Sequence, residues 1–126
     1  MRTISIVSLL LAFTLSLLAS IGDGQWLARV PAKEAARENP LASDPGATRV
    51  GAKLFAQHCA ECHGKDGGGK NGKPSLHSAH VAQATPGQLF WLLTNGSLKN
   101  GMPSWSRLPE QQRWQLVTHV KTIVSH

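Results

Sequence analysis

The sequence places its only two cysteines, Cys59 and Cys62, two residues apart and follows them directly with His63. Two thiols and an imidazole this near in sequence lie near each other in any fold, so the motif constrains the chain more than any other stretch. Three kinds of site use such a motif: a dithiol redox site, a zinc site and a covalent haem site. The rest of the sequence must decide among them.

The N-terminal segment predicts export. Arg2 supplies a short positive region, and the run from Thr3 to Gly22 carries no charge. Such a segment is typical of a signal peptide, and it is also just long enough to span a bilayer. We expect residues 1–22 to be a signal peptide or an N-terminal membrane anchor, with possible anchorage through residues 4–21. The domain is then periplasmic or held on the outer face of the cytoplasmic membrane.

Composition divides the remaining chain into two parts. Residues 23–43 are rich in Pro and Ala and show little apolar periodicity, which is typical of a linker. Trp26 and Leu27 in this segment could dock on the domain or lie at a membrane surface, and the sequence does not decide. We expect one domain at residues 44–126.

The domain is predicted to be all-α, with three main helices joined by long loops. A capping residue followed by Pro begins the first helix at Asp44 and the second at Thr85, and Pro109 opens the third. Apolar residues recur at helical spacing in all three segments, and no alternation typical of strands appears. Between the first two helices, five glycines within residues 64–72 exclude regular structure.

So much loop creates an energetic problem. A domain of about 80 residues with this loop content buries too little apolar area to offset its chain entropy. Small scaffolds of this kind need a disulfide, a metal or a cofactor. We expect the cysteine motif to supply this stabilising group.

Two of the three hypotheses fit poorly. A dithiol redox site usually lies in a βαβ fold, which the absence of strand patterns argues against. A zinc site would pair the cysteines with His77 and His80, with fourteen residues between Cys62 and His77. The spacing of these two histidines is one residue short of the usual range, and a glycine run replaces the apolar positions of a zinc finger.

Covalent haem fits best, because Cys-x-x-Cys-His is its attachment signature. Each thiol, on Cys59 and on Cys62, would form a thioether with one haem vinyl group, giving one haem c per chain. His63 would then bind the iron as an axial ligand. The motif uses every cysteine in the chain and supplies the element that the fold lacks.

The sixth ligand has several candidates. They are Met102 and the histidines His58, His77, His80, His119 and His126. Met102 lies in the loop between the second and third helices, followed by a stiffening proline, and can approach from the side opposite the cysteines. His77 and His80 remain alternatives.

The domain resembles class I mono-haem c-type cytochromes over about residues 44–126. The resemblance rests on GAKLFAQHCAECHG, then KPSL, then TNGSLKNGMPSW, and on the apolar last helix. It implies the small cytochrome c fold, with long loops wrapped around the haem, and His/Met ligation through His63 and Met102. It also implies that the first helix crosses the last, with Gly51 and Phe55 at the crossing.

The same resemblance assigns further residues. At the crossing, Gly51 and Phe55 would face Leu116, His119 and Val120, although the family usually has an aromatic residue where His119 stands. Pro74 matches the proline whose carbonyl accepts the Nδ1–H of the histidine ligand, a bond that fixes the imidazole. We also expect Trp105 to form a wall of the haem pocket and to reach a propionate.

The resemblance implies electron transfer and no enzymatic activity, because a six-coordinate iron has no open position. The iron would cycle between Fe(III) and Fe(II) while exported redox proteins donate and accept electrons. The alternative is a haem c subunit of a membrane oxidase or of a periplasmic dehydrogenase complex. If Met102 does not bind, the open iron could instead sense small ligands or react with peroxide.

The net charge of +6 bears on the partner. Export excludes nucleic acid as an expected partner, whereas an acidic docking surface on a redox protein would suit a basic chain. The lysines near the motif that could steer such a partner are Lys65, Lys70, Lys73 and Lys99.

Overall fold

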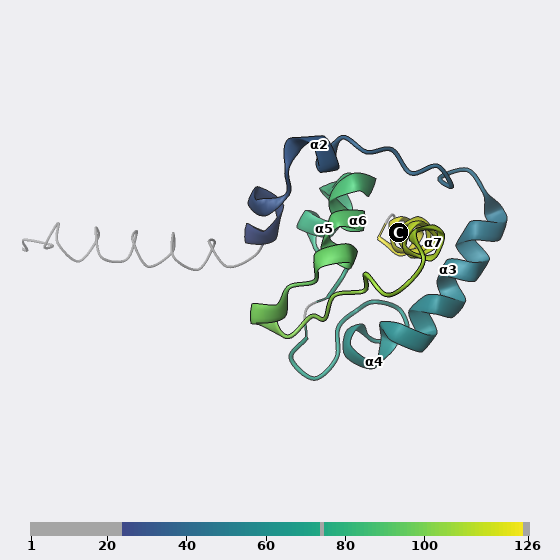
Figure 1. Cartoon of the computed structure of the whole chain (residues 1–126). Coiled ribbons are helices and arrows are strands. Elements are labelled where there is room, and N and C mark those ends of the chain that lie inside the picture. Colours follow the sequence, from purple (N-terminus) through teal and green to yellow (C-terminus); the bar gives the residue numbers. More distant parts are fainter. Residues whose placement is uncertain (1–23, 74, 125–126) are drawn as a thin grey trace, which may run out of the picture.

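The computed structural model describes residues 24–73 and 75–124. Its helices are η1 (Gln25–Arg29), α2 (Ala32–Ala35), α3 (Pro45–His58), α4 (Ala60–His63), α5 (Ala79–Gln83), α6 (Pro86–Asn95), η2 (Leu98–Asn100) and α7 (Glu110–Ile123). Regular structure in the described residues is helical apart from two isolated bridges. The all-α prediction is confirmed, and α7 lies between α3 and α6 (Figure 1).

The three main helices begin where the sequence predicts. The Asp44 side chain accepts a hydrogen bond of 2.8 Å from the Gly46 N–H at the start of α3. Thr85 and Gln88 form a capping box at the start of α6, each side chain bonding the other residue's backbone N–H. Helix α7 follows Pro109. These local contacts satisfy backbone donors that a helix start leaves unpaired.

The crossing of α3 and α7 depends on a glycine. A Cβ built on Gly51 would lie 2.0 Å from the carbonyl oxygen of Gln115 and 2.9 Å from the His119 Cβ. The Phe55 ring lies beside the His119 ring, with centroids 5.2 Å apart. The predicted crossing is confirmed, with an imidazole filling the place of an aromatic ring, and burial there lowers the pKa of His119.

Among the described residues, two small clusters form the core. One contains Ala84, Leu89, Phe90, Trp114 and Val117 between α6 and α7. The other contains Leu54, Phe55 and Leu116 at the crossing of α3 and α7. Because α7 contributes to both, it joins the half of the fold that carries the cysteines to the half that carries α6.

The described part of the segment predicted to be a linker packs against the domain. We call residues 24–43 the N-terminal strap. A Cβ on Gly87 of α6 would lie 2.1 Å from the carbonyl oxygen of Glu34 and 2.9 Å from that of Ala35. Thr85 Oγ1 donates a 2.7 Å hydrogen bond to the same Ala35 oxygen. Figure 1 shows the strap passing over α6 on its way to α3.

Side chains of the strap strengthen this docking. Arg37 lies over the rings of Phe90 and Trp114, at 4.6 and 5.2 Å from their centroids. It also donates a 2.7 Å hydrogen bond to Glu110, and this bond holds the pKa of Glu110 below its usual value. Trp26 and Leu27 pack on the first core cluster, which decides the question that the sequence left open.

The predicted signal peptide or anchor at residues 1–22 lies outside the described residues. In the part of the chain that is described, none of the helices is both long and apolar enough to cross a membrane. The boundary between the linker and the domain, placed between residues 43 and 44 from composition, remains a prediction.

The crossing generates a prediction. Gly51→Ala should lower the free energy of unfolding by about 1–3 kcal/mol, because the added methyl meets the backbone of α7 and the helices must separate. Denaturant unfolding of the holoprotein would measure this. Gly46→Ala is the matched control on the same helix, since the three atoms nearest its Cβ would be side-chain atoms of Asp44 and Arg49 and not the backbone of α7. Equal stability of the two variants would contradict the close crossing.

Candidate haem site

The cysteine motif forms one turn of helix at the end of α3. Cys59 ends α3, where its N–H donates to the Phe55 carbonyl at 2.8 Å, and it also caps α4. The N–H of His63 donates to the Cys59 carbonyl at 2.9 Å, and that of Cys62 donates to the same oxygen at 3.2 Å. Positions three and four residues apart are neighbours on a helix surface, so the turn places Cys62 and His63 each about one turn from Cys59.

The two thiols are free and lie in different surroundings. Cys62 is exposed, whereas Cys59 is half-buried and packs on the cluster of Leu54, Phe55 and Leu116. Burial, followed by the charge of Cys62, raises the pKa of the Cys59 thiol to about 11. Redox-active dithiols rely on a lowered pKa, so this environment argues against the dithiol hypothesis.

The glycine-rich loop is closed by its own hydrogen bonds. The Gly69 N–H donates to the His63 carbonyl at 2.7 Å, and the Leu76 N–H donates to the Gly67 carbonyl at 2.7 Å. Gly67 has a φ of 77°, which only glycine adopts readily. Leu76, directly after the loop, packs on the second core cluster. Pro74, expected to accept the Nδ1–H of His63, lies outside the described residues.

The histidines considered as alternative ligands contact other groups. His77 Nε2 lies 2.8 Å from the Asp66 carbonyl oxygen, and the His80 ring lies against Gly24 of the strap. The His58 ring lies 5.2 Å from that of Trp105. His119 is at the helix crossing, and His126 lies outside the described residues.

The zinc hypothesis receives no support from this arrangement. Among the described residues, no three Cys, His, Asp or Glu side chains gather as metal ligands would. In particular, His77 and His80 do not join the cysteines.

Met102 lies in a loop that is fastened to the end of α6. We call residues 96–108 the methionine loop. Ser97 and Met102 exchange two backbone hydrogen bonds, of 2.9 and 3.1 Å, so the segment between them forms a closed turn. A Cβ on Gly96 would lie 2.6 Å from the carbonyl carbon of Pro103, so the two backbones pack directly. Met102 itself is half-buried.

The methionine loop also reaches the cysteine half of the fold. The backbone N–H of Trp105 donates to the Leu93 carbonyl at 2.8 Å. Its ring lies against that of His58, the neighbour of Cys59. The Arg107 guanidinium also lies over the Trp105 ring, with its Cζ 4.5 Å from the ring centroid. The structure thus brings Trp105 to the end of α3, beside the cysteine motif.

The glycine-rich loop lies next to the methionine loop. A Cβ on Gly101 would lie 3.4 Å from Lys73 Nζ. The two loops that carry Lys65, Lys70, Lys73 and Lys99 therefore meet close to Met102.

The residues at this site fit a haem c. The donor set is two free thiols and an imidazole on one helical turn. Half-buried apolar side chains from four different segments pack on the cluster beside Cys59, namely Leu76, Leu93, Leu108 and Ile123. An apolar macrocycle would find walls of matching chemistry here.

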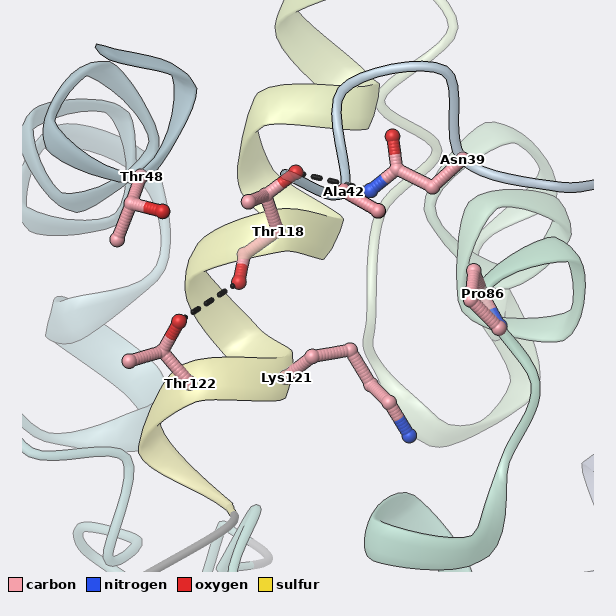
Figure 2. Close-up of a pocket in the computed structure, with 7 residues that line it drawn as sticks. All are labelled: Asn39, Ala42, Thr48, Pro86, Thr118, Lys121 and Thr122. Carbon is pink, nitrogen blue, oxygen red and sulfur yellow. Dashed lines mark hydrogen bonds between the residues drawn. The ribbon is translucent and has the colours of Figure 1, made fainter. Parts of the chain in front are cut away.

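An open hollow of about 510 Å³ lies elsewhere, between the strap, α3, α6 and α7 (Figure 2). Its lining residues are Asn39, Ala42, Thr48, Pro86, Thr118, Lys121 and Thr122. Several of its polar groups serve the fold, since Asn39 donates to Thr118 Oγ1 at 2.8 Å and Lys121 donates to the Ala84 carbonyl at 2.9 Å. None of the lining residues belongs to the cysteine motif or the methionine loop, so chemistry rather than cavity size identifies the site.

Sequence reasoning missed the residues that hold the methionine loop. Ser104 Oγ donates to the Thr94 carbonyl at 2.6 Å, and Arg113 on α7 donates to Thr94 Oγ1. Asn95-Gly96 reads only as a helix end, so nothing local shows that Gly96 packs on the loop it precedes. An Arg at position 113 resembles any solvent-facing residue of an amphipathic helix.

Comparison with known proteins gives the family. A family model described as cytochrome c oxidase, cbb3-type, subunit III matches residues 46–120, more than half of the chain. The cbb3-type cytochrome c oxidase subunit CcoP of Rubrivivax gelatinosus is 53% identical over 36 residues, which make up 29% of this chain and 12% of that protein. This chain therefore matches only a small part of that relative. No solved structure matches.

The family match runs continuously through the cysteine motif, the glycine-rich loop and the methionine loop, and ends within α7. The resemblance to c-type cytochromes is thus confirmed by a comparison that does not depend on the motif alone. The chain belongs to the family of cbb3-type cytochrome c oxidase subunit III and is a c-type cytochrome domain.

Proposed function

We propose that the chain transfers electrons as the haem c subunit of a membrane oxidase, the alternative that the sequence left open. The observation that carries this proposal is a Cys59–His63 attachment turn inside a match to an oxidase-subunit family. A freely diffusing carrier is the other candidate. Co-purification with oxidase subunits from solubilised membranes tests the choice, and recovery of the holoprotein alone would favour the free carrier.

Cys59 and Cys62 would hold one haem c through two thioethers, and His63 would be an axial ligand to its iron. When bound, the haem supplies reversible one-electron chemistry between Fe(III) and Fe(II). The chain's contribution is positional: Cys59, Cys62 and His63 lie on one short helical turn, and the bond from the Gly69 N–H holds the His63 backbone. Pro74 remains the proposed acceptor for the His63 ring N–H.

Met102 is the proposed second axial ligand. Support comes from the closed turn that fixes its backbone and from the contacts that engage His58, His77, His80 and His119 elsewhere. Ligation on both faces would leave no position for a substrate, so the proposed activity is electron transfer without catalysis. Trp105 would form a wall of the pocket beside the cysteines.

The proposed partner surface is the part of the molecule where the glycine-rich loop and the methionine loop lie side by side. It offers lysines from both loops and Leu98, which is 73% exposed. An apolar contact within a basic surface suits an acidic redox protein, because charges steer the encounter and the apolar contact adds affinity. We place the domain outside the cytoplasm, with residues 1–22 as a cleaved signal or as an anchor through residues 4–21.

Covalent attachment is the first test. Haem should remain with the protein through acid–acetone extraction, whereas Cys59→Ala/Cys62→Ala should lose it. The doubly substituted chain should also show little helix by circular dichroism, because the apolar walls around Cys59 would lack their cofactor. Haem that extracts freely from the native protein would refute the attachment.

The second test concerns Met102. Met102→Ala should remove the weak long-wavelength absorption band of a sulfur–ferric bond, lower the potential and let the ferrous protein bind carbon monoxide. Met102→His should keep six ligands but lower the potential, because imidazole favours ferric iron more than thioether does. An unchanged spectrum and potential in Met102→Ala would assign the ligand to another residue.

The third test concerns the lysines. Lys70→Glu/Lys99→Glu should slow reduction by an acidic partner about tenfold or more at low salt. The effect should shrink once ionic strength passes about 0.1 M, where the Debye length is roughly 10 Å. Lys33→Glu/Lys53→Glu, on exposed residues of α2 and α3, is the control with equal charge change. Equal slowing by both pairs would show a net-charge effect and no local docking surface.

A further inference from the structure

Both ends of the methionine loop meet one side chain of α7. Arg113 Nη1 donates a hydrogen bond to Thr94 Oγ1, just before the loop, and Arg113 Nε donates to the Leu108 carbonyl at 3.2 Å, at its far end. These two acceptors are fourteen residues apart in sequence. The guanidinium therefore closes the loop across its base.

Thr94 links the hydrogen bonds of Arg113 to the part of the methionine loop that carries Met102. Its hydroxyl accepts from Arg113 and donates to the Phe90 carbonyl at 2.9 Å, which uses the group in both roles. Its carbonyl accepts from Ser104 Oγ, two residues beyond Met102, at 2.6 Å. A displacement of Thr94 would thus be transmitted to the residues next to the proposed ligand.

The position of the guanidinium is itself fixed. Arg113 is half-buried, and its Cζ lies 4.7 Å from the centroid of the Phe90 ring. A planar guanidinium stacked on a ring directs several donors at set angles, whereas a lysine ammonium has no fork of this kind. Hydrogen bonds from a charged donor are also stronger than neutral ones.

We propose that Arg113 is a positioning residue for Met102: it holds the methionine loop closed and so keeps the thioether sulfur within reach of the iron. The inference rests on the proposed role of Met102 as a ligand. The backbone turn between Ser97 and Met102 shapes the tip of the loop, and Leu108 at its far end packs on the cluster that contains Leu116 of α7. The side-chain hydrogen bonds that tie both ends of the loop to α7 come from Arg113.

The test uses the full haem-loaded chain with Arg113→Lys and, as a second variant, Thr94→Val, which leaves the net charge unchanged. Both should speed hydrogen exchange at the Met102 and Trp105 amides by at least about tenfold, a ratio that corresponds to about 1.4 kcal/mol. Both should weaken the sulfur–ferric band and speed carbon monoxide binding to the ferrous protein. The double variant should show less than the sum of the two effects, because the residues share one bond.

Two controls separate positioning from general destabilisation. Thr94→Ser keeps the hydroxyl and should behave as the native protein does. Arg49→Lys makes the same exchange at an exposed site on α3 and should change none of the readouts. Amides in the α3–α7 core should keep their native exchange rates in all the variants.

The outcomes distinguish this inference from the proposed function. If Met102→Ala removes the band while Arg113→Lys and Thr94→Val change neither exchange nor ligand binding, the role of Arg113 is refuted and electron transfer stands. If exchange rises equally throughout the core, Arg113 is a general stabilising residue and the inference fails. If Met102→Ala leaves the band intact, the ligand assignment and the inference both fail, while covalent haem is unaffected.

Discussion

The close contact between α3 and α7 at Gly51 is the constraint on which the rest of the structure depends. No side chain separates the backbone of α3 from the Gln115 carbonyl, so the angle and register of the two helices are set together. Phe55, one turn further along, is buried by this contact, and Cys59 follows one turn later. The position of the attachment turn is therefore a consequence of helix packing, and a shift at the crossing would move both thiols as one unit.

Helix α7 relates the two halves of the site. On one side it holds α3 and hence the cysteine motif. On the other it packs Trp114 against Phe90 of α6, with the rings nearly parallel and their centroids 4.0 Å apart. The methionine loop connects α6 to α7 (Figure 1). The two proposed ligands of the iron thus come from segments that do not belong to one continuous element, and a shared helix supplies their common frame.

Local sequence predicted the parts of this protein that depend on local chemistry. Caps at Asp44 and Thr85, and the attachment turn itself, are readable because their partners lie within a few residues. The family resemblance added the crossing at Gly51, although its physical cause, a carbonyl on α7, is far away in sequence. Contacts made at long range by a backbone or by one polar side chain, such as those of Arg113, leave no periodic pattern. They could not be predicted, and neither could the docking of the strap.

The strap carries a consequence for how the chain tolerates change. Its backbone oxygens, at residues 34, 35 and 37, face Gly87, so this part of its docking depends on main-chain shape and not on which side chains the strap bears. Apart from Arg37, Asn39 and the apolar residues that pack on the core, the residues of the strap can vary without loss of the interface, and Pro and Ala suit a segment that must keep its shape. The constraint falls instead on one distant glycine. At this contact, substitutions should therefore be tolerated more readily in the strap than at position 87.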